Sequence, residues 1–373
     1  MMQHLSSYLD WYVHVPQVKY DLRSSGTEHF KHNLVLEDVD LSTNYAYGNP
    51  EATKLLAERY RVRPENVFIS SEGTSGQNLR IIKCLAEMCK RKNEAIVEYP
   101  TYEPLLRQVQ EYFPHLKRLE RKEKDAYHLD AEALRKIVSE KTGLLVLTNP
   151  HAPSGAVARA EELREVMNVA CEYDFHVLSD EIYAEFDRNA TPTLFSIDPE
   201  LGIVTTSLTK AYGLGGLKFG TALARKELVS KCYADTLSTV GNSPNIVQLF
   251  AVELLTRGKS DLEKHKRKWA ALKQDTEKWL NEKNFEYFPN KISITYWIKT
   301  AVKDTYKWIN EKTIPKHNLS LVPGAFFLFK NGYRLETSNF VRLGLGNVNP
   351  DNSNLAKAFE TLEEAFGSTK LKT

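Results

Sequence analysis

The stretch "TTSLTKAYGLGGLKFG" (205–220) places Lys210 in a loop with glycines at positions 213, 215, 216 and 220. Hydroxyl side chains precede this lysine, and a second cation, Lys218, follows it eight residues later. An amine in a desolvated site beside other cations has a lowered pKa, which suits it to Schiff-base chemistry. A lone lysine near glycines is usually a surface residue, so the segments around it must decide between the two interpretations.

Short apolar runs alternate with longer amphipathic segments along the first two thirds of the chain. The runs that predict buried strands are "NVFIS" (66–70), "AIVEYP" (95–100), "LLVLT" (144–148), "FHVLSDE" (175–181), "GIVTTS" (202–207) and "GTALA" (220–224). Residues 75–92 predict a helix with an apolar face formed by Leu79, Ile82, Leu85, Ala86 and Cys89. The alternation predicts an α/β fold: a mainly parallel sheet with helices on both sides, and ligands beyond the carboxyl ends of its strands.

The pattern changes after about residue 242. Residues 244–285 predict long helices without an intervening strand, and further strands follow at 291–300, 319–324 and 339–346. We therefore predict three parts: an N-terminal segment (1–40) that joins the smaller domain, a large domain (41–275) and a smaller α+β domain (276–373).

The composition excludes several classes of protein. Hydrophobic residues make up 42% of the 373 and the net charge is only +2, which disfavours a nucleic-acid-binding protein. No apolar run approaches the roughly 18 residues of a membrane helix. The four cysteines have neither metal-ligand nor disulfide spacing, so we predict no metal site and a reducing compartment. The first residues lack a secretory pattern, and we expect a cytoplasmic protein.

Polar residues follow several of the predicted strands. Gly73, Thr74 and Ser75 form a small-residue turn that opens a helix, which is either a phosphate site or an ordinary helix cap. Tyr102 follows the second strand, where an aromatic ring either packs or stacks on a ligand. Asn149 begins the turn "NPHAPSG" (149–155), whose composition is typical of turns in general.

Asp180 and Glu181 end the fourth predicted strand, and Tyr183 lies three residues beyond Asp180. A carboxylate at the mouth of a buried sheet needs a partner, because an unpaired buried charge is costly. A protonated ring nitrogen of a ligand or a local Lys or Arg would serve equally.

In this order, and each after its own strand, these residues resemble those of the fold-type I pyridoxal-phosphate enzymes, specifically the class I/II aminotransferases. The resemblance covers roughly residues 40–350. It implies that Lys210 forms the internal aldimine with pyridoxal 5′-phosphate and later moves the proton between Cα and the cofactor's C4′. Asp180 would pair with the pyridinium nitrogen, Tyr183 would hydrogen-bond the phenolic oxygen, and Tyr102 would stack on the ring.

The resemblance also assigns the two anion-binding ends of the site. The cofactor's phosphate would be held by Gly73, Thr74, Ser75, Ser207 and Lys218. Tyr47, with Tyr45 as a rival, would reach the phosphate of the neighbouring subunit in a homodimer. Arg342, in "FVRLGLG", would bind the substrate α-carboxylate, a task suited to a planar guanidinium. Selectivity for the substrate side chain would come from residues 21–30, which include Gly26, and from 322–327.

Two positions depart from the family pattern. Ala152 precedes Pro-Ser-Gly where the family has an asparagine that donates to the phenolic oxygen, and Asn149, three residues earlier, is the candidate for that role. Lys218 replaces the arginine expected eight residues after the lysine, so a point charge replaces a fork of donors.

The resemblance implies an aminotransferase that moves an amino group between an L-amino acid and a 2-oxo acid. Because of the two departures, another reaction on the same scaffold stays open: a decarboxylase, a β-lyase, or an amino-acid oxidase or cyclase. A non-catalytic binding protein on this scaffold is the alternative from another class.

Overall fold

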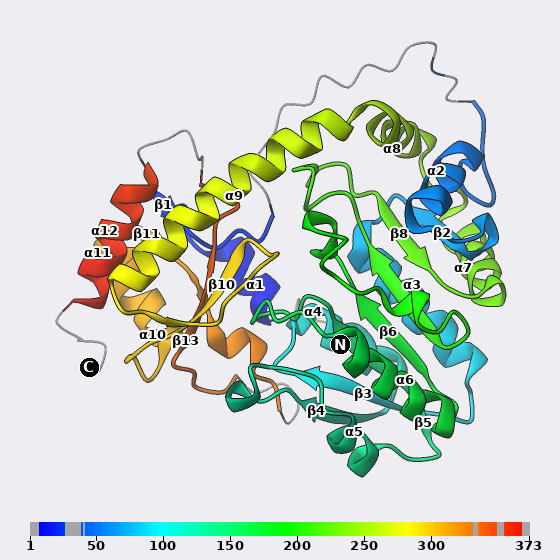
Figure 1. Cartoon of the computed structure of the whole chain (residues 1–373), viewed down its shortest axis with the longest axis horizontal. Coiled ribbons are helices and arrows are strands. Elements are labelled where there is room, and N and C mark those ends of the chain that lie inside the picture. The colour runs from blue at the N-terminus through cyan, green and yellow to red at the C-terminus, as the bar shows by residue number, and fades with distance from the viewer. Residues whose placement is uncertain (1–6, 27–38, 40–41, 331–334, 349–353, 368–373) are drawn as a thin grey trace.

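The computed structural model describes residues 7–26, 39, 42–330, 335–348 and 354–367 (Figure 1). Its main sheet has seven strands. In spatial order they are β2 (Val67–Ser70), β8 (Gly220–Leu223), β7 (Gly202–Thr206), β6 (His176–Asp180), β5 (Thr142–Thr148), β3 (Glu94–Tyr99) and β4 (His115–Glu120). β8 is antiparallel to both of its neighbours, and the other pairs are parallel. The predicted α/β class and mainly parallel sheet are confirmed.

All six predicted strands of this sheet are present, and β4 is an additional one. Its sequence, HLKRLE, has two leucines among charged or polar residues, and only Leu119 is buried. An edge strand with one buried position has no continuous apolar run, so the sequence criterion missed it.

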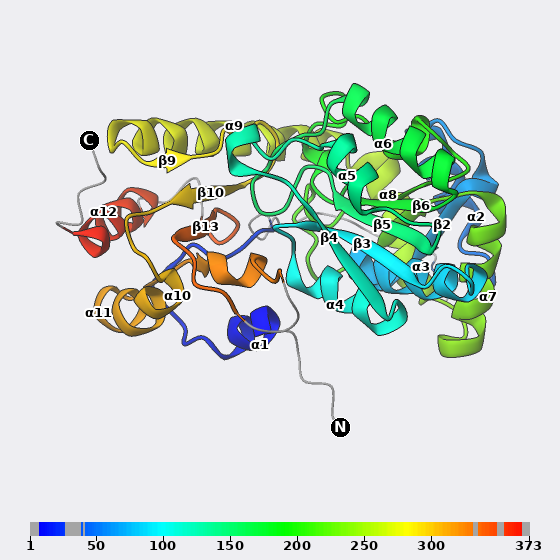
Figure 2. The ribbon, with the colours of Figure 1, turned by 90° about the horizontal axis from the view of Figure 1, so that it is seen from below.

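Helices cover both faces of this sheet (Figure 2). One face carries α3 (Gly73–Met88), α4 (Glu103–Tyr112) and α7 (Lys226–Val240), and the other carries α5 (Ala131–Ile137) and α6 (Ala160–Tyr173). Each layer has its own apolar core, with Ile81 and Leu85 in the first and Leu163 and Val166 in the second. Because most strands of this sheet are buried on both faces, their sequences are continuous apolar runs.

The predicted apolar face of α3 is partly wrong. Ile82 and Leu85 are buried, but Leu79, Ala86 and Cys89 are only half-buried. Gln77 and Asn78 are buried instead, together with Ile81 and Cys84. The helix is rotated so that two amides face the sheet, which a purely apolar criterion misses.

A second, antiparallel sheet lies beside the first. Its order is β12 (Val322–Pro323), β13 (Phe340–Gly344), β10 (Thr295–Lys299) and β9 (Glu286–Tyr287). Helices α2 (Pro50–Tyr60) and α8 (Asn245–Arg257) pack together near the main sheet, while α9 (Lys259–Glu282) runs from α8 toward the smaller sheet (Figure 1). Around the smaller sheet lie α10 (Thr305–Trp308), α11 (Ile314–His317) and α12 (Asn354–Phe366). Trp279 of α9 stacks on Phe359 of α12 at 4.3 Å between ring centroids.

The N-terminal residues lie with this second sheet. α1 (Ser7–His14) packs Trp11 against Phe326, and β1 (Tyr20–Asp21) pairs in parallel with β11 (Leu319–Ser320). The domain boundaries near residues 40 and 275 stay a prediction. Of the helices that the structure describes, none is long and apolar enough to cross a membrane.

The register of the main sheet brings three strand ends together. Thr148 at the end of β5 pairs with Asp180 of β6, and Asp180 pairs with Thr205 of β7. Side chains that follow these positions therefore meet at one edge of the sheet, where open α/β sheets bind ligands.

Candidate active site

A pocket of about 290 Å³ opens at this edge of the sheet. It is lined by Ser25, Glu72, Gly73, Thr74, Ser75, Tyr102, Thr148, Pro150, Ala152, Asp180, Ile182, Tyr183, Thr209, Lys210, Lys218 and Arg342. Ten of the residues singled out from the sequence are in this set: Gly73, Thr74, Ser75, Tyr102, Ala152, Asp180, Tyr183, Lys210, Lys218 and Arg342. Arg342 comes from the smaller sheet. One concave site thus receives side chains from both sheets.

Lys210 is one of the residues that line this pocket. Its Nζ donates a hydrogen bond to Ser25 Oγ at 3.1 Å and lies 6.0 Å from the ring centroid of Tyr183. Burial lowers the pKa of Lys210 to about 8, and the charges of Arg342 and Lys218 act in the same direction. Near physiological pH the neutral, nucleophilic fraction of this amine is therefore much larger than that of an ordinary lysine.

Asp180 is held at the end of β6 by two hydrogen bonds. Asn78 Nδ2 donates to Oδ2 at 2.8 Å, and the backbone N–H of Ile182 donates to Oδ1 at 3.1 Å. Asn78 is fixed in turn by Thr205 Oγ1, which donates to its Oδ1 at 2.5 Å. Burial nevertheless raises the pKa of Asp180 to about 6, so this carboxylate would gain from a cationic partner in the pocket.

The turn after β2 has the features of an anion site. Gly73 starts α3 with φ +68°, and its N–H is already donated to the carbonyl of Lys218 at 2.5 Å. The next N–H groups of this 16-residue helix have no partner within the helix. Thr74 Oγ1 is buried and has no hydrogen-bond partner among the described residues. An unsatisfied hydroxyl, a helix N-terminus and Lys218 together fit a phosphate group.

Arg342 lies on β13 and is only 4% exposed. Its Nη2 donates to Tyr8 Oη at 3.1 Å and to the carbonyl of Arg23 at 2.9 Å. Its Nε is buried without a partner among the described residues. A buried guanidinium with an unused donor fits a carboxylate ligand, because both charges would then be paired.

Four predicted residues lie elsewhere. Asn149 is buried outside the pocket, where its amide donates to the carbonyl of Pro192 at 3.1 Å and accepts from the N–H of Ala158 at 3.0 Å. Ser207 donates to the carbonyl of Phe219 at 2.5 Å. Their positions after strands were predicted well, but strand position does not say which way a side chain turns.

Tyr47 and Gly26 also lie outside the pocket lining. The Tyr47 ring is 68% exposed and packs edge-on against Tyr233 at 5.7 Å between centroids. Gly26 is near the pocket through its neighbour Ser25, and its N–H donates to Ser24 Oγ at 3.3 Å.

The sequence interpretation missed several contributors. Asn78 orients Asp180 but sits on a helix face that we predicted from apolar residues alone. Ser25 and Tyr8 reach Lys210 and Arg342 across 185 and 334 residues of sequence, so no local pattern reveals them. Thr148, the last residue of β5, could have been found by the same strand-end criterion that found Asp180.

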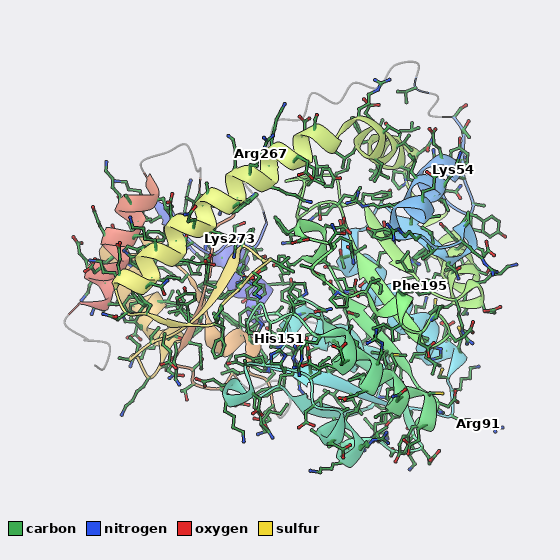
Figure 3. All side chains as sticks on the ribbon, viewed as in Figure 1. Lys54, Arg91, His151, Phe195, Arg267 and Lys273 are labelled. Carbon is green, nitrogen blue, oxygen red and sulfur yellow. The ribbon has the colours of Figure 1, made fainter. Side chains whose placement is uncertain are left out.

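A network of buried polar side chains contacts Thr148, which lines the pocket. Glu98 of β3 accepts from Arg121 Nη1 at 2.8 Å and from the N–H and Oγ1 of Thr148 at 2.7 and 2.5 Å. His151, labelled in Figure 3, donates from Nε2 to the carbonyl of Pro100 at 3.0 Å, and its ring stacks on Tyr127. Burial and the nearby Arg121 hold the pKa of His151 well below its usual value, so its ring is neutral. This network fixes the turn that carries Thr148 and Ala152.

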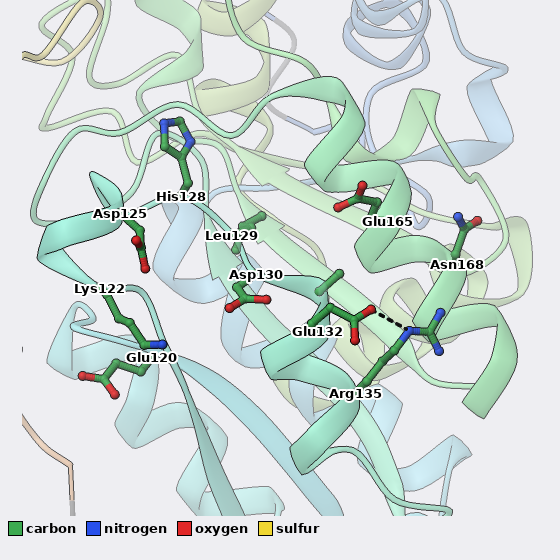
Figure 4. A pocket seen from close by; sticks show the side chains of 11 residues that line it. Glu120, Lys122, Asp125, His128, Leu129, Asp130, Glu132, Arg135, Glu165 and Asn168 are labelled. Carbon is green, nitrogen blue, oxygen red and sulfur yellow. Dashed lines mark ion pairs between the residues drawn. The ribbon is translucent and has the colours of Figure 1, made fainter.

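A second pocket, of about 530 Å³, has the opposite electrostatic character (Figure 4). Five carboxylates line it, from Glu120, Asp125, Asp130, Glu132 and Glu165, against the cations Lys122 and Arg135. Glu132 and Arg135 pair with each other at 3.7 Å. An anionic ligand would be repelled there, whereas the pocket with Lys210 has three cations and one orphaned hydroxyl.

Comparison with known proteins identifies the family of this chain. The family "Aminotransferase class I and II" matches residues 37–360. An aspartate/prephenate aminotransferase of Thermus thermophilus is 28% identical over 226 residues, which cover 57% of this chain and 57% of that protein. A cystathionine beta-lyase of Corynebacterium glutamicum is 26% identical over 194 residues, covering 51% and 50%. These alignments span about half the length of the curated relatives.

The fold is matched over its whole length. A PLP-dependent aminotransferase from Streptococcus suis superimposes with a TM-score of 0.86 at 22% identity, covering 100% of both chains. Pyridoxal phosphate is the cofactor of this family, and the pocket's phosphate-binding turn and lysine fit it. From the family match over most of its length, this chain belongs to the class I and II aminotransferases.

Proposed function

We propose that this protein is a pyridoxal-phosphate-dependent aminotransferase that moves an amino group between an L-amino acid and a 2-oxo acid. The observation that carries the proposal is the meeting of Lys210, Asp180 and Arg342 in one pocket. An aminotransferase needs an amine to hold the cofactor, a carboxylate to keep its ring protonated and a cation for the substrate carboxylate.

The chain's own residues divide this work. When bound, pyridoxal phosphate supplies an electron sink for the charge that develops at the substrate Cα. Lys210 Nζ would hold the cofactor and, once released, would take and return the Cα proton. Asp180 would keep the ring nitrogen protonated, because a buried carboxylate and a cation stabilise each other. Tyr183 and Tyr102 would contact the phenolic oxygen and the ring face.

The two anionic ends of cofactor and substrate would lie at separate cations. Thr74, Ser75 and Lys218 would bind the phosphate, and Arg342 would bind the α-carboxylate. Thr74 Oγ1 and Arg342 Nε are the two orphaned donors among these groups, so ligand binding would satisfy both. Ser207 would act by fixing the loop near Phe219 and Thr209.

We also propose a cytoplasmic homodimer with the three-part domain division given above. The four cysteines are all free thiols, which is typical of a reducing compartment. Tyr47, with Tyr45 as its rival, would contact the partner's cofactor phosphate, and its exposed ring is consistent with a protein partner.

A β-lyase is the second candidate, because one of the relatives is a cystathionine beta-lyase. Both activities begin with the same proton removal at Cα, so the pocket alone does not separate them. The test is to add single amino acids to the holoprotein without a 2-oxo acid. Stoichiometric conversion of the cofactor to its pyridoxamine form, read by absorbance, supports transamination. Catalytic release of ammonia and a 2-oxo acid from a cysteine conjugate would support the lyase instead.

A further inference from the structure

Tyr8 of α1 reaches the guanidinium of Arg342 although neither the sequence patterns nor the family resemblance assigned it a role. Its side chain is 5% exposed, and its Oη accepts a hydrogen bond from Arg342 Nη2 at 3.1 Å. The ring lies 5.6 Å from that of Tyr102, the residue expected to stack on the cofactor. The Arg342 Cζ lies 5.7 Å from the Tyr8 ring and 5.3 Å from that of Phe327. Tyr8 therefore lies between the carboxylate-binding and ring-binding parts of the site.

The hydrogen bonds of Arg342 limit which of its N–H donors can bind a carboxylate. Nη2 carries two protons, and both are used, one by Tyr8 Oη and the other by the carbonyl of Arg23. A carboxylate therefore cannot form the usual two-pronged contact through Nη2 unless one of these bonds breaks. Nη1 has no hydrogen-bond partner among the described residues, and Nε is buried without one.

The Tyr8 hydroxyl carries a proton that it can donate to a carboxylate bound at Arg342. It accepts from Arg342, and no acceptor for its own O–H is found among the described residues. The hydroxyl lies at Arg342, and Arg342 lines the pocket that also contains Lys210. A donor at Arg342 is near the place where the substrate carboxylate would bind.

Hydrogen bonds at the start of α1 fix the position of the helix and of the Tyr8 side chain. The buried carboxylate of Glu103 accepts from the N–H of Ser7 at 3.0 Å and of Tyr8 at 2.7 Å. These are N-terminal N–H groups that the helix itself cannot satisfy. Arg107 donates to the same carboxylate at 2.7 Å. Because Glu103 directly follows Tyr102, the helix that carries Tyr8 is fixed relative to the ring-binding residue.

We propose that the Tyr8 hydroxyl donates a hydrogen bond to the α-carboxylate of the amino-acid substrate, acting beside Arg342 as a second carboxylate-binding residue. The proposal rests on the function proposed above. Arg342 would donate to the Tyr8 hydroxyl, which polarises its O–H, and this O–H would donate in turn to the carboxylate. Ligands with a carboxylate next to the amine should depend on Tyr8, and simple amines should not.

The test compares 2-aminoisobutyrate with isopropylamine, which has the same carbon skeleton without the carboxylate. 2-Aminoisobutyrate has no Cα proton and cannot be transaminated by proton removal, so its dissociation constant is read from the cofactor absorbance at equilibrium. Isopropylamine has such a proton, so its dissociation constant is read from the rapid absorbance change on mixing, before any proton removal. Tyr8→Phe keeps the ring and removes the donor. We expect it to weaken 2-aminoisobutyrate by about 10- to 100-fold, the range for a hydrogen bond to a charged group, and to leave isopropylamine within about twofold.

Tyr12→Phe is the matched control, because Tyr12 lies one turn along α1 with its ring 5.8 Å from that of Tyr8. It should leave both constants unchanged. Glu103→Gln should weaken 2-aminoisobutyrate through displacement of α1, and its effect should not add to that of Tyr8→Phe. This second variant keeps the test decisive if Tyr8→Phe lowers the stability of the protein.

The outcomes separate the two proposals. If the wild type prefers 2-aminoisobutyrate and Tyr8→Phe keeps that preference in full, the role of Tyr8 is wrong and the proposed function stands. Equal weakening of both compounds would also overturn it, because it would show a purely structural role. A wild type that binds the two compounds equally well would contradict both proposals.

Discussion

Lys210 performs its proposed chemistry in the neutral form of its amine. Because burial lowers its pKa from 10.5 to about 8, we predict that cofactor-free protein captures pyridoxal phosphate at a rate that rises with pH through an inflection near 8. Below this pH the amine is protonated and cannot attack the aldehyde, and above it the rate levels off. Stopped-flow absorbance measures the profile, with Lys210→Ala as the control that lacks the reaction. An inflection near 10.5 would show that the amine is not desolvated.

In the proposed site, Ala152 would leave the cofactor's phenolic oxygen with fewer donors than the family pattern provides. Asn149 would not replace the missing amide, since its own amide bonds to Pro192 and Ala158. We predict that Ala152→Asn moves the pH of the bound cofactor's absorbance transition down by roughly one unit, because a hydrogen bond to the deprotonated form favours that form. A spectrophotometric pH titration measures the shift.

Ala152→Val is the matched control, because it enlarges the same position without adding a donor. It should leave the transition where the wild type has it. An unmoved midpoint in Ala152→Asn would mean that another group already donates to this oxygen.

At the residue scale, the sequence predicted those site residues whose position along the chain carries the information. Lys210 and Asp180 follow strand ends, and the topology brings all such ends to one edge. Tyr8 and Asn78 act through contacts over 334 and 102 residues, which only the tertiary structure creates. Asn149 and Ser207 occupy strand ends as well, but local hydrogen bonds turn them away from the pocket.

At the element scale, β3, β4 and β5 are tied together by the buried pair of Glu98 and Arg121. Removing one partner of such a pair leaves an uncompensated charge, so we predict that Glu98→Ala lowers the free energy of unfolding by about 3–5 kcal/mol. Urea unfolding followed by fluorescence measures this loss. The exposed pair of Glu161 and Arg164 gives the control: Glu161→Ala should cost at most about 1 kcal/mol. Equal effects of the two changes would contradict a structural role for the buried pair.

The strands of the main sheet were predicted better than its helix faces. A strand buried on both sides has an apolar run that turn residues delimit, and β5, for example, is buried along its entire length. α3 instead turns Gln77 and Asn78 inward, because these amides bond to groups of the sheet. An edge strand such as β4 has a single buried side and only one fully buried residue, so its signal is weak.

At the scale of the whole molecule, the pocket combines Arg342 from the smaller sheet with Lys210 and Asp180 from the larger one. In the proposed homodimer, the exposed ring of Tyr47 would contact the other copy of the chain. We predict that sedimentation velocity finds a particle of twice the chain's mass, and that Tyr47→Ala weakens cofactor retention by the dimer. Tyr306→Ala, at an aromatic position 37% exposed, is the control and should retain the cofactor as the wild type does. A single-chain mass at micromolar concentration would contradict the homodimer.

The central claim is that Lys210 is the residue to which the cofactor is attached. Borohydride reduction of the holoprotein, followed by proteolysis and mass spectrometry of the peptides, tests it most directly. We predict that the reduced cofactor is found on the peptide that contains Lys210 and that Lys218 remains unlabelled, because Lys210 has the desolvated amine with the lowered pKa. A label on Lys218, or on a lysine outside the pocket, would contradict the account.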